Sequence, residues 1–139
     1  MTTQNRCDLR RLSAGELMHP DPQWAAPDES LRTAGQRMAT QGIRALLVAG
    51  SSPDQLPGIL TSKDIVNLLA SHEADVLDRL QVRDVMTRPA ICIPRQANAH
   101  DCLQLMRATG VRRLPVLDGM RVVGILSTSD LFVHLLREC

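Results

Sequence analysis

Two short motifs carry residues that could bind a phosphorylated sugar. Each has a glycine, two apolar residues, a hydroxyl residue, two variable residues and an aspartate, at residues 58–64 and 124–130. The hydroxyl residue, Thr61 or Ser127, can cap a helix that begins after it. Unpaired N–H groups in that first helical turn would favour a bound anion such as a phosphate. The pattern therefore predicts an anion-binding helix start in each motif.

The aspartate of each motif adds a group suited to a sugar. Asp64 and Asp130 each have two carboxylate oxygens, which could accept hydrogen bonds from two neighbouring ribose hydroxyls. Such charged hydrogen bonds contribute about 1.5–3 kcal/mol each. Gly58 and Gly124 would leave room for close approach at the strand end. A second interpretation stays open, because Thr-x-x-Asp and Ser-x-x-Asp are also near-capping boxes, in which the acid only satisfies the N-cap amide.

The two motifs belong to an internal repeat. Two segments recur with an offset of 68 residues and a third with an offset of 66, at 16–18 and 84–86, 36–48 and 104–116, and 58–65 and 124–131. Three segments of different character keep almost the same spacing, so coincident helical periodicities do not explain the match. A duplicated unit of this size usually buries its apolar face against its twin.

The apolar spacing predicts the same succession of elements in each copy. We expect a strand, a helix, two strands and a second helix, with Gly42 and Gly110 ending the first helices. The fold class is therefore α+β, with two pseudo-symmetric β-α-β-β-α repeats packed as one module. The expected elements are 24–26, 31–41, 45–48, 58–60 and 62 to about 71 in the first copy, and 91–93, 99–109, 114–117, 122–126 and 128 to about 137 in the second.

This succession resembles a tandem pair of CBS domains, the regulatory module named after cystathionine β-synthase. The similarity is close in the second copy, over residues 82–87, 105–106, 111–118 and 124–131. The first copy departs from it, with His19 in place of Thr87 and Leu47 in place of Pro115. The resemblance places repeat 1 at 14–72 and repeat 2 at 80–137.

The resemblance implies a disk-like module, often a homodimer, with adenosine-containing ligands in clefts between the repeats. Those ligands are AMP, ADP, ATP, S-adenosylmethionine or NAD, bound as regulatory ligands and not as tightly held cofactors. The implied function is a non-catalytic sensor that could act on an unidentified target protein. The alternative is a structural or dimerisation scaffold that modulates a partner protein without a ligand.

The resemblance also assigns basic side chains to the ligand phosphates. Arg44, Arg112 and Arg113 stand between the helix-ending glycine and the central strand, which would place them at the cleft mouth. Lys63 is a further phosphate candidate. A solvated loop charge or a dimer salt bridge remains an alternative role for each arginine.

In the resembled family, the adenine slot beside the ribose-binding aspartate of one repeat is lined largely by the entry strand of the other repeat. The Asp64 cleft would then be lined by Thr87 and by residues 90–93, which include Ile91. The Asp130 cleft would be lined by His19, Trp24 and Ala26. Because His19 and Trp24 depart from the commoner pattern, this second cleft is expected to differ in its ligand or in its free space.

The composition narrows the class of protein. The chain has 139 residues, of which 44% are apolar, with 16 Lys and Arg against 15 Asp and Glu. This balance is typical of one soluble globular domain. The net charge of +1 gives no reason to expect nucleic acid or an anionic membrane as a partner. Because Trp24 and Phe132 are the only aromatic residues, we expect an aliphatic core and no platform for stacking bases.

The remaining chemistry-bearing residues form no expected site. Cys7, Cys92, Cys102 and Cys139 lack the spacing of a zinc site or a secreted disulfide framework, so we expect free thiols. The sequence shows no signal peptide and no apolar stretch of bilayer length, which favours a reducing cytoplasm. The consecutive residues 100–102, His-Asp-Cys, would diverge on a helix and cannot form a nucleophile–base pair. We therefore expect no enzyme activity and no metal site.

Overall fold

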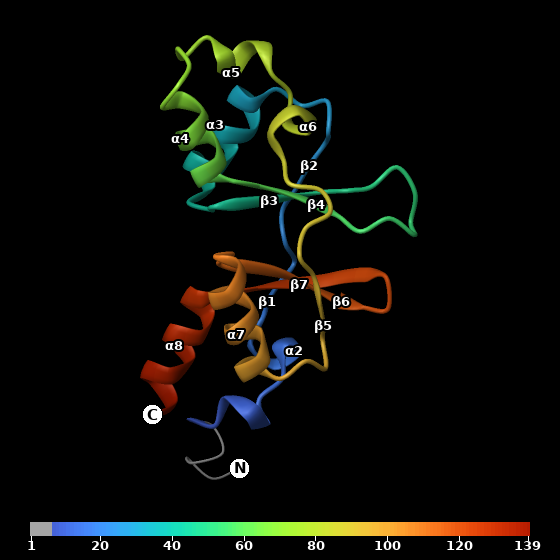
Figure 1. The fold of residues 1–139 in the computed structure, drawn as a ribbon, viewed down its shortest axis with the longest axis vertical. Helices are drawn as coiled ribbons and strands as arrows, with labels where there is room; N and C mark the ends of the chain where they lie inside the picture. The colour runs from blue at the N-terminus through green and yellow to red at the C-terminus, as the bar shows by residue number, and fades with distance from the viewer. Residues whose placement is uncertain (1–6) are drawn as a thin grey trace. The chain divides into compact units, whose positions relative to one another are not determined.

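The computed structural model describes residues 7–139, which form two compact units (Figure 1). We call residues 23–90 the first-repeat unit, and residues 7–22 with 91–139 the second-repeat unit. The chain thus does not divide at the repeat boundary. The segment that opens the first copy belongs to the second-repeat unit, and the segment that opens the second copy belongs to the first-repeat unit.

The first-repeat unit is a three-stranded sheet covered by helices. Its sheet has the order β2-β3-β4, with β2 parallel to β3 and β3 antiparallel to β4. Thr87 forms an antiparallel bridge with Ile59 of β4. The elements are β2 (Trp24–Ala25), α3 (Leu31–Gln41), β3 (Ala45–Val48), β4 (Gly58–Thr61), α4 (Ser62–Leu69), α5 (Val76–Arg79) and α6 (Val82–Val85).

The second-repeat unit has the same layout with one more strand. Its sheet has the order β1-β7-β6-β5, in which β5 is parallel to β6 and the other neighbours are antiparallel. The elements are η1 (Leu9–Arg11), α2 (Ala14–Leu17), β1 (His19–Pro20), β5 (Ile93–Pro94), α7 (Ala99–Thr109), β6 (Arg113–Asp118), β7 (Arg121–Ser127) and α8 (Thr128–Glu138). The predicted β-α-β-β-α succession is confirmed in both copies.

Local sequence signals explain where the long helices begin and end. The Ser30 side chain accepts a hydrogen bond from the Thr33 backbone N–H at 3.1 Å and caps α3. The Asn98 side chain does the same for α7, through the Asp101 N–H at 2.8 Å. Both helices end at a glycine in the left-handed region, Gly42 or Gly110. The predicted ends of both helices are confirmed.

Each unit has its own aliphatic core. In the first-repeat unit the buried residues come from β2, α3, β3, β4 and α6: Ala25, Leu31, Ala34, Met38, Leu46, Val48, Leu60 and Val82. The core of the second-repeat unit includes Leu12, Met106, Leu114, Val116, Leu126 and Leu131. Burial of each large aliphatic side chain contributes about 1.5–3 kcal/mol. Among residues 7–139, no helix combines the length and the apolar character needed to cross a membrane.

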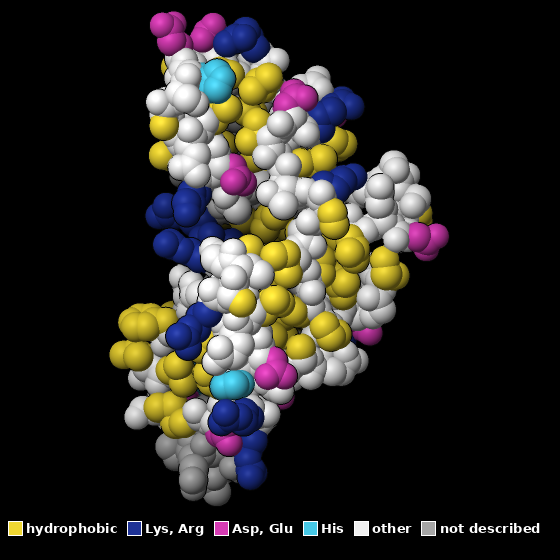
Figure 2. Space-filling view, viewed as in Figure 1, with side chains coloured by type: hydrophobic (Ala, Val, Ile, Leu, Met, Phe, Trp, Pro, Cys, Tyr) yellow, Lys and Arg dark blue, Asp and Glu magenta, His cyan; other side chains and the backbone are white. Residues whose placement is uncertain are grey.

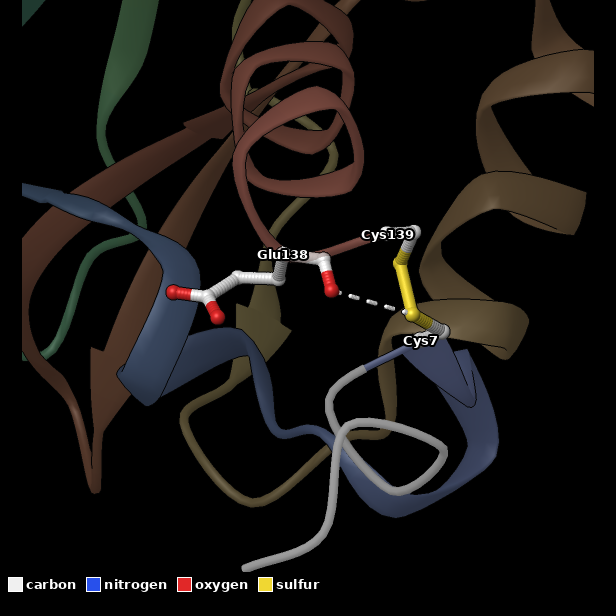
Figure 3. The surroundings of a disulfide bond; sticks show 3 residues. All are labelled: Cys7, Glu138 and Cys139. Carbon is white, nitrogen blue, oxygen red and sulfur yellow. Dashed lines mark hydrogen bonds between the residues drawn. A yellow bond between two sulfur atoms is a disulfide. The ribbon is translucent and has the colours of Figure 1, made fainter.

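A disulfide joins Cys7 to Cys139 within the second-repeat unit (Figure 3). The expectation of free thiols is wrong for this pair and right for Cys92 and Cys102. Sequence spacing gave no sign of the bond, because it depends on the N-terminal segment meeting Cys139, the residue directly after α8. Burial raises the pKa of both remaining thiols, that of Cys92 and that of Cys102. In the disulfide, Cys7 Sγ lies 3.5 Å from the Glu138 carbonyl oxygen but has no proton to donate.

Candidate functional site

Both predicted motifs form complete capping boxes. In the first-repeat unit, the Thr61 N–H donates to Asp64 Oδ2 at 2.8 Å, and the Asp64 N–H donates to Thr61 Oγ1 at 3.2 Å. In the second-repeat unit, the Ser127 N–H donates to Asp130 Oδ2 at 2.9 Å, and the Asp130 N–H donates to Ser127 Oγ at 3.1 Å. The capping-box interpretation is therefore confirmed. It leaves a ligand role possible only through atoms that the box does not use.

The first turns of α4 and α8 offer fewer N–H groups than the sequence predicted. The Ser62 N–H donates to the Arg44 carbonyl at 2.9 Å, and the Thr128 N–H donates to the Arg112 carbonyl at 3.1 Å. The capping box uses a second N–H of each first turn. One N–H per first turn therefore remains outside these hydrogen bonds, that of Lys63 in α4 and that of Ser129 in α8. The expectation of several free amides is thus corrected, because the preceding loop of each unit runs alongside the helix start.

The aspartates nevertheless keep one oxygen outside the box. Every bond of the two boxes that involves a carboxylate uses Oδ2, so Oδ1 of Asp64 and of Asp130 takes no part in them. Both side chains are half-buried and are not sealed by packing. Oδ1 is left for one ribose hydroxyl, whereas a second hydroxyl would share Oδ2 with a backbone N–H.

Gly58 and Gly124 make room for the protein itself. A Cβ on Gly124 would lie 2.5 Å from Met18 Sδ and 2.7 Å from the His19 carbonyl oxygen. A Cβ on Gly58 would lie 3.0 Å from Met86 Sδ and 3.2 Å from the Thr87 carbonyl oxygen. The prediction that these glycines leave space for a ligand is therefore corrected. The segment that enters from the other copy fills the space.

Thr87 and His19 occupy matching places beside the two strands. Thr87 exchanges two backbone hydrogen bonds of 2.9 Å with Ile59, two residues before Thr61. His19 pairs with Ile125, two residues before Ser127. Both side chains are exposed, and His19 Nδ1 lies 2.8 Å from the Pro20 carbonyl oxygen. The predicted crossing thus brings Thr87 into the unit of Asp64 and His19 into the unit of Asp130.

Three other residues predicted to line an adenine slot lie outside the unit that contains the aspartate of that slot. Trp24 pairs with Leu47, so it and the adjoining Ala26 belong to the unit of Asp64. Ile91 belongs to the unit of Asp130 and is exposed. Their assignment to a particular cleft stays a prediction.

The basic residues differ between the two helix starts. Arg113 lies on β6 directly opposite Ser127, whereas Ala45 occupies the same position opposite Thr61. Arg44 and Arg112 are exposed at equivalent loop positions, and Lys63 is exposed in the first turn of α4. The second cation beside the cap therefore comes from the strand in the second-repeat unit, as Arg113, and from the first helical turn in the first-repeat unit, as Lys63.

Arg88 is a structural residue that the sequence did not indicate. Its Nη2 donates to the carbonyl oxygens of Val48 at 3.3 Å and Ala49 at 2.9 Å. Its Nη1 reaches Gln55 Oε1 at 3.5 Å, and the same oxygen accepts the Ser51 N–H at 2.7 Å. Arg88 thus anchors the Thr87 segment to the turn between β3 and β4. No periodicity or motif could have identified it, because its partners are backbone oxygens distant in sequence.

The part of the chain from residue 7 onward holds no group of three or more His, Cys, Asp or Glu side chains placed to bind a metal ion. The polar groups available at the two helix starts are the carboxylate Oδ1, one backbone N–H and the neighbouring arginines and lysine.

Comparison with known proteins matches both halves of the chain to one family. The model of the CBS domain family matches residues 14–71 and 82–137. A crystal structure described as a CBS domain, NE2398, is 33% identical, covers 90% of this chain and 98% of its own, and has a TM-score of 0.79. The hexameric CBS-CP12 protein from bloom-forming cyanobacteria is 26% identical, with 89% and 71% covered and a TM-score of 0.82.

A curated relative, the uncharacterized protein MK0525 of Methanopyrus kandleri, is 27% identical over 88% of this chain and 62% of its own length. Two further curated relatives are longer still, since the chain spans 22% of one and 39% of the other. The similarity therefore concerns a module that also occurs within larger proteins.

Proposed function

Because the chain belongs to the CBS domain family and carries the domain twice, we propose that it is a regulatory sensor for an adenosine-containing ligand. The ligand is AMP, ADP, ATP, S-adenosylmethionine or NAD, bound reversibly and not transformed. Binding changes the activity of a target protein, through a homodimer whose equilibrium between two states the ligand shifts. A ligand can do this only through its different affinity for the two states.

The observation that supports this proposal most is the unused oxygen of each capping-box aspartate. In Asp64 and in Asp130 the carboxylate Oδ2 accepts the backbone N–H of the N-cap residue, and this bond holds Oδ1 beside a helix start. A fixed acceptor binds a ribose hydroxyl without the entropic cost of ordering a side chain. We assign ribose binding to these two aspartates.

The remaining roles follow from charge and register. Arg44 and Lys63 would bind phosphate in the first-repeat unit, and Arg112 and Arg113 in the second. Thr61 and Ser127 hold the aspartates. Thr87, His19 and Ile91 would contact the base.

We propose that the protein works in the cytoplasm. Persistent disulfides are rare in a reducing compartment. In that compartment we therefore expect Cys7 and Cys139 to be thiols for much of the time, and the disulfide to form under oxidation.

Isothermal titration calorimetry with AMP, ATP, NAD and S-adenosylmethionine tests the sensor function. Asp64→Asn and Asp130→Asn are the matched variants, because the amide oxygen can still accept the N-cap N–H while the charge is lost. We expect at least one ligand to bind and one variant to weaken it about tenfold, which corresponds to 1.4 kcal/mol. Both variants should melt close to the wild-type temperature. Absence of heat with all four ligands would overturn the proposal.

A scaffold without a ligand is the second candidate, and one observation favours it. The Ser127 hydroxyl also donates to Asp130 Oδ2 at 2.9 Å. The Asp130 carboxylate thus accepts two hydrogen bonds within the capping box, and fewer of its acceptor positions are left for a ligand. Thermal melting separates the two functions. A ligand at 100 times its dissociation constant stabilises the fold by about 2.7 kcal/mol, whereas a scaffold shows no shift.

A further inference from the structure

Two parts of the second-repeat unit meet at one candidate ligand site and are joined again far from it. One part is the N-terminal segment, residues 7–20, which runs through η1 and α2 to β1. The other part is α8, which begins after Ser127 and is followed by Cys139. The disulfide joins Cys7, at the start of the segment, to Cys139 (Figure 3). It therefore links the ends of both parts that lie away from the site.

The other ends of these two parts are joined by strand pairing. His19 of β1 lies opposite Ile125 of β7, and β7 leads directly into the capping box of Ser127 and Asp130. The N-terminal segment, the end of β7, α8 and the disulfide thus form a closed ring within one unit. We call the helix start at Asp130, with His19 beside it, the Asp130 site, and the helix start at Asp64, with Thr87 beside it, the Asp64 site.

The middle of the N-terminal segment is held without the disulfide. The Ala14 N–H donates to the Ala97 carbonyl at 2.7 Å, and the Ala99 N–H donates to the Leu12 carbonyl at 2.8 Å. Leu12 and Ala14 are both buried. We therefore expect residues 12–15 to stay in place whether the cysteines are oxidised or reduced.

The first residues of the segment are held mainly by exposed polar contacts. Arg10 Nη2 lies 3.4 Å from His100 Nε2, and Arg11 Nε lies 3.5 Å from Asp8 Oδ2, while Leu9 packs against the core. Figure 2 shows basic, acidic and histidine side chains together at the lower end of the view, over η1 and the start of α7 in Figure 1. Exposed pairs of this kind contribute little to stability. The tie between the segment and α8 at this end therefore depends on the disulfide.

The two sulfur atoms are placed for reversible oxidation. Cys139 is exposed, Cys7 is half-buried, and their Cα atoms lie 5.7 Å apart. In the reduced protein, the Cys139 thiolate can attack a low-molecular-weight disulfide such as glutathione disulfide, which forms a mixed disulfide and releases one thiol. The Cys7 thiolate then attacks the Cys139 sulfur and releases the second thiol. The protein thiols lose two protons and two electrons, and the small disulfide accepts both.

We propose that the redox state of Cys7 and Cys139 sets the affinity of the Asp130 site for its ligand, an inference that rests on the proposed sensor function. With the disulfide closed, the N-terminal segment and α8 are tied at both ends, so that His19 and Asp130 are ordered before the ligand binds. A preordered site loses less entropy on binding and binds more tightly. The oxidised protein is therefore the form with high affinity at this site, and the reduced protein is the form with low affinity.

The Asp64 site is the control within the same chain. Residues 23–90, which form its unit, include no cysteine. Thr87 is held beside Ile59 by two backbone hydrogen bonds, and the neighbouring Arg88 donates to the Ala49 carbonyl. Oxidation changes none of these contacts, so the Asp64 site is expected to have the same affinity in both redox states.

Ligand binding and disulfide formation must affect each other to the same extent, because both act on one equilibrium. If oxidation raises the affinity about fivefold, a saturating ligand must favour the disulfide about fivefold. For a two-electron couple this lowers the reduction potential of the Cys7–Cys139 pair by about 20 mV.

Titration calorimetry of the full chain with AMP, ATP, NAD and S-adenosylmethionine, with and without excess dithiothreitol, tests the regulation. Asp64→Asn leaves the Asp130 site, and its dissociation constant should rise about fivefold on reduction. Asp130→Asn leaves the Asp64 site, and its dissociation constant should not change. Cys139→Ser should bind like the reduced protein in both buffers, whereas Cys92→Ser, which removes a thiol outside the disulfide, should keep the redox response.

Hydrogen exchange gives a reading that needs no ligand. The amides of β1 and of the first turn of α8 should exchange at least threefold more slowly in the oxidised protein. Equal exchange in the two states, equal affinity of Asp64→Asn in the two states, or an equal loss in Asp130→Asn would overturn the regulation and leave the sensor function standing. No binding of any of the four ligands in either state would overturn the sensor function and this inference with it.

Discussion

In the second-repeat unit a covalent bond joins the N-terminal segment to Cys139, the residue that follows α8, whereas in the first-repeat unit an exposed ion pair joins α3 to α5. The two units have the same strand and helix order and the same capping boxes. They differ in what holds the peripheral segments. The comparison shows that the duplicated motif specifies the sheet and the helix starts, while the segments outside it are fixed by unrelated interactions in each copy.

The largest effect in this comparison should come from the disulfide. It closes a loop with a sequence separation of 132 residues, and for such a loop the chain-entropy account gives up to about 5 kcal/mol of stabilisation. Cys7→Ser should lower the free energy of unfolding by several kcal/mol in urea denaturation under oxidising conditions. Cys139→Ser should match it, and the double variant should add nothing further. An unchanged midpoint on reduction of the wild type would contradict this expectation.

The next effect tests how closely the entering segment approaches each sheet. Gly124→Ala places a Cβ 2.7 Å from a backbone oxygen, so β1 must shift, and we expect a loss of about 1–3 kcal/mol. Gly58→Ala meets its neighbours at 3.0 Å and beyond, and should cost less. Gly35→Ala, which places a Cβ 3.4 Å from Ile65 Cδ1, is the control, which should be neutral or stabilising. The loss in free energy of unfolding, measured in urea, should be largest for Gly124→Ala, smaller for Gly58→Ala and absent for Gly35→Ala. Equal losses at Gly124 and Gly58 would show that the entering segment approaches both sheets equally closely.

Much of the core fold could be predicted from local signals. Ser30 and Gly42 delimit α3 because capping and left-handed backbone depend on a few adjacent residues, and the same holds for Asn98 and Gly110 around α7. The repeat then supports the same assignment in both copies. The capping box was recognised as an alternative for the same reason, since it is formed within four residues.

What the sequence could not show depends on segments distant along the chain. Gly58 and Gly124 were recognised as positions of close approach, but which atoms approach was assigned wrongly, to a ligand and not to Met86 and Met18. The carbonyls of Arg44 and Arg112 that satisfy the helix starts were missed as well. Such pairings follow from the path of the loops in space, which no spacing rule encodes.

The helix caps offer a smaller test of the same comparison. The Ser127 hydroxyl accepts a hydrogen bond from the Asp130 N–H and donates one to Asp130 Oδ2. The Thr61 hydroxyl accepts the matching bond from the Asp64 N–H but donates none to Asp64. Loss of a cap costs about 0.5–2 kcal/mol. We expect Ser127→Ala to lie in the upper part of that range and Thr61→Ala in the lower part, by urea denaturation. A larger loss for Thr61→Ala would show that the additional hydroxyl bond does not stabilise α8.

The smallest effect should be the pH dependence of the ion pair that joins α3 to α5. The Arg32 guanidinium donates to both carboxylate oxygens of Asp78, and this hydrogen bonding lowers the pKa of Asp78 below its ordinary value. A carboxyl whose pKa is lower in the folded state stabilises the fold above its ordinary pKa, and this contribution is lost as the pH falls through the folded value. The loss should therefore appear below about pH 4.

Both side chains of the pair are exposed, so salt should screen the interaction and the contribution should be slight. Melting temperature measured from pH 6 to pH 2.5 should fall less steeply for Asp78→Asn than for wild type, and the difference should shrink in 1 M salt. Asp75→Asn is the matched control, because Asp75, the N-cap residue of α5, pairs with Arg79 of that helix and does not bridge two helices. If Asp75→Asn reduced the pH dependence of the melting temperature as much as Asp78→Asn, the ion pair between α3 and α5 would not be the cause of that dependence. The first-repeat unit would then hold α5 through apolar packing of the buried Val76 and the partly buried Leu77.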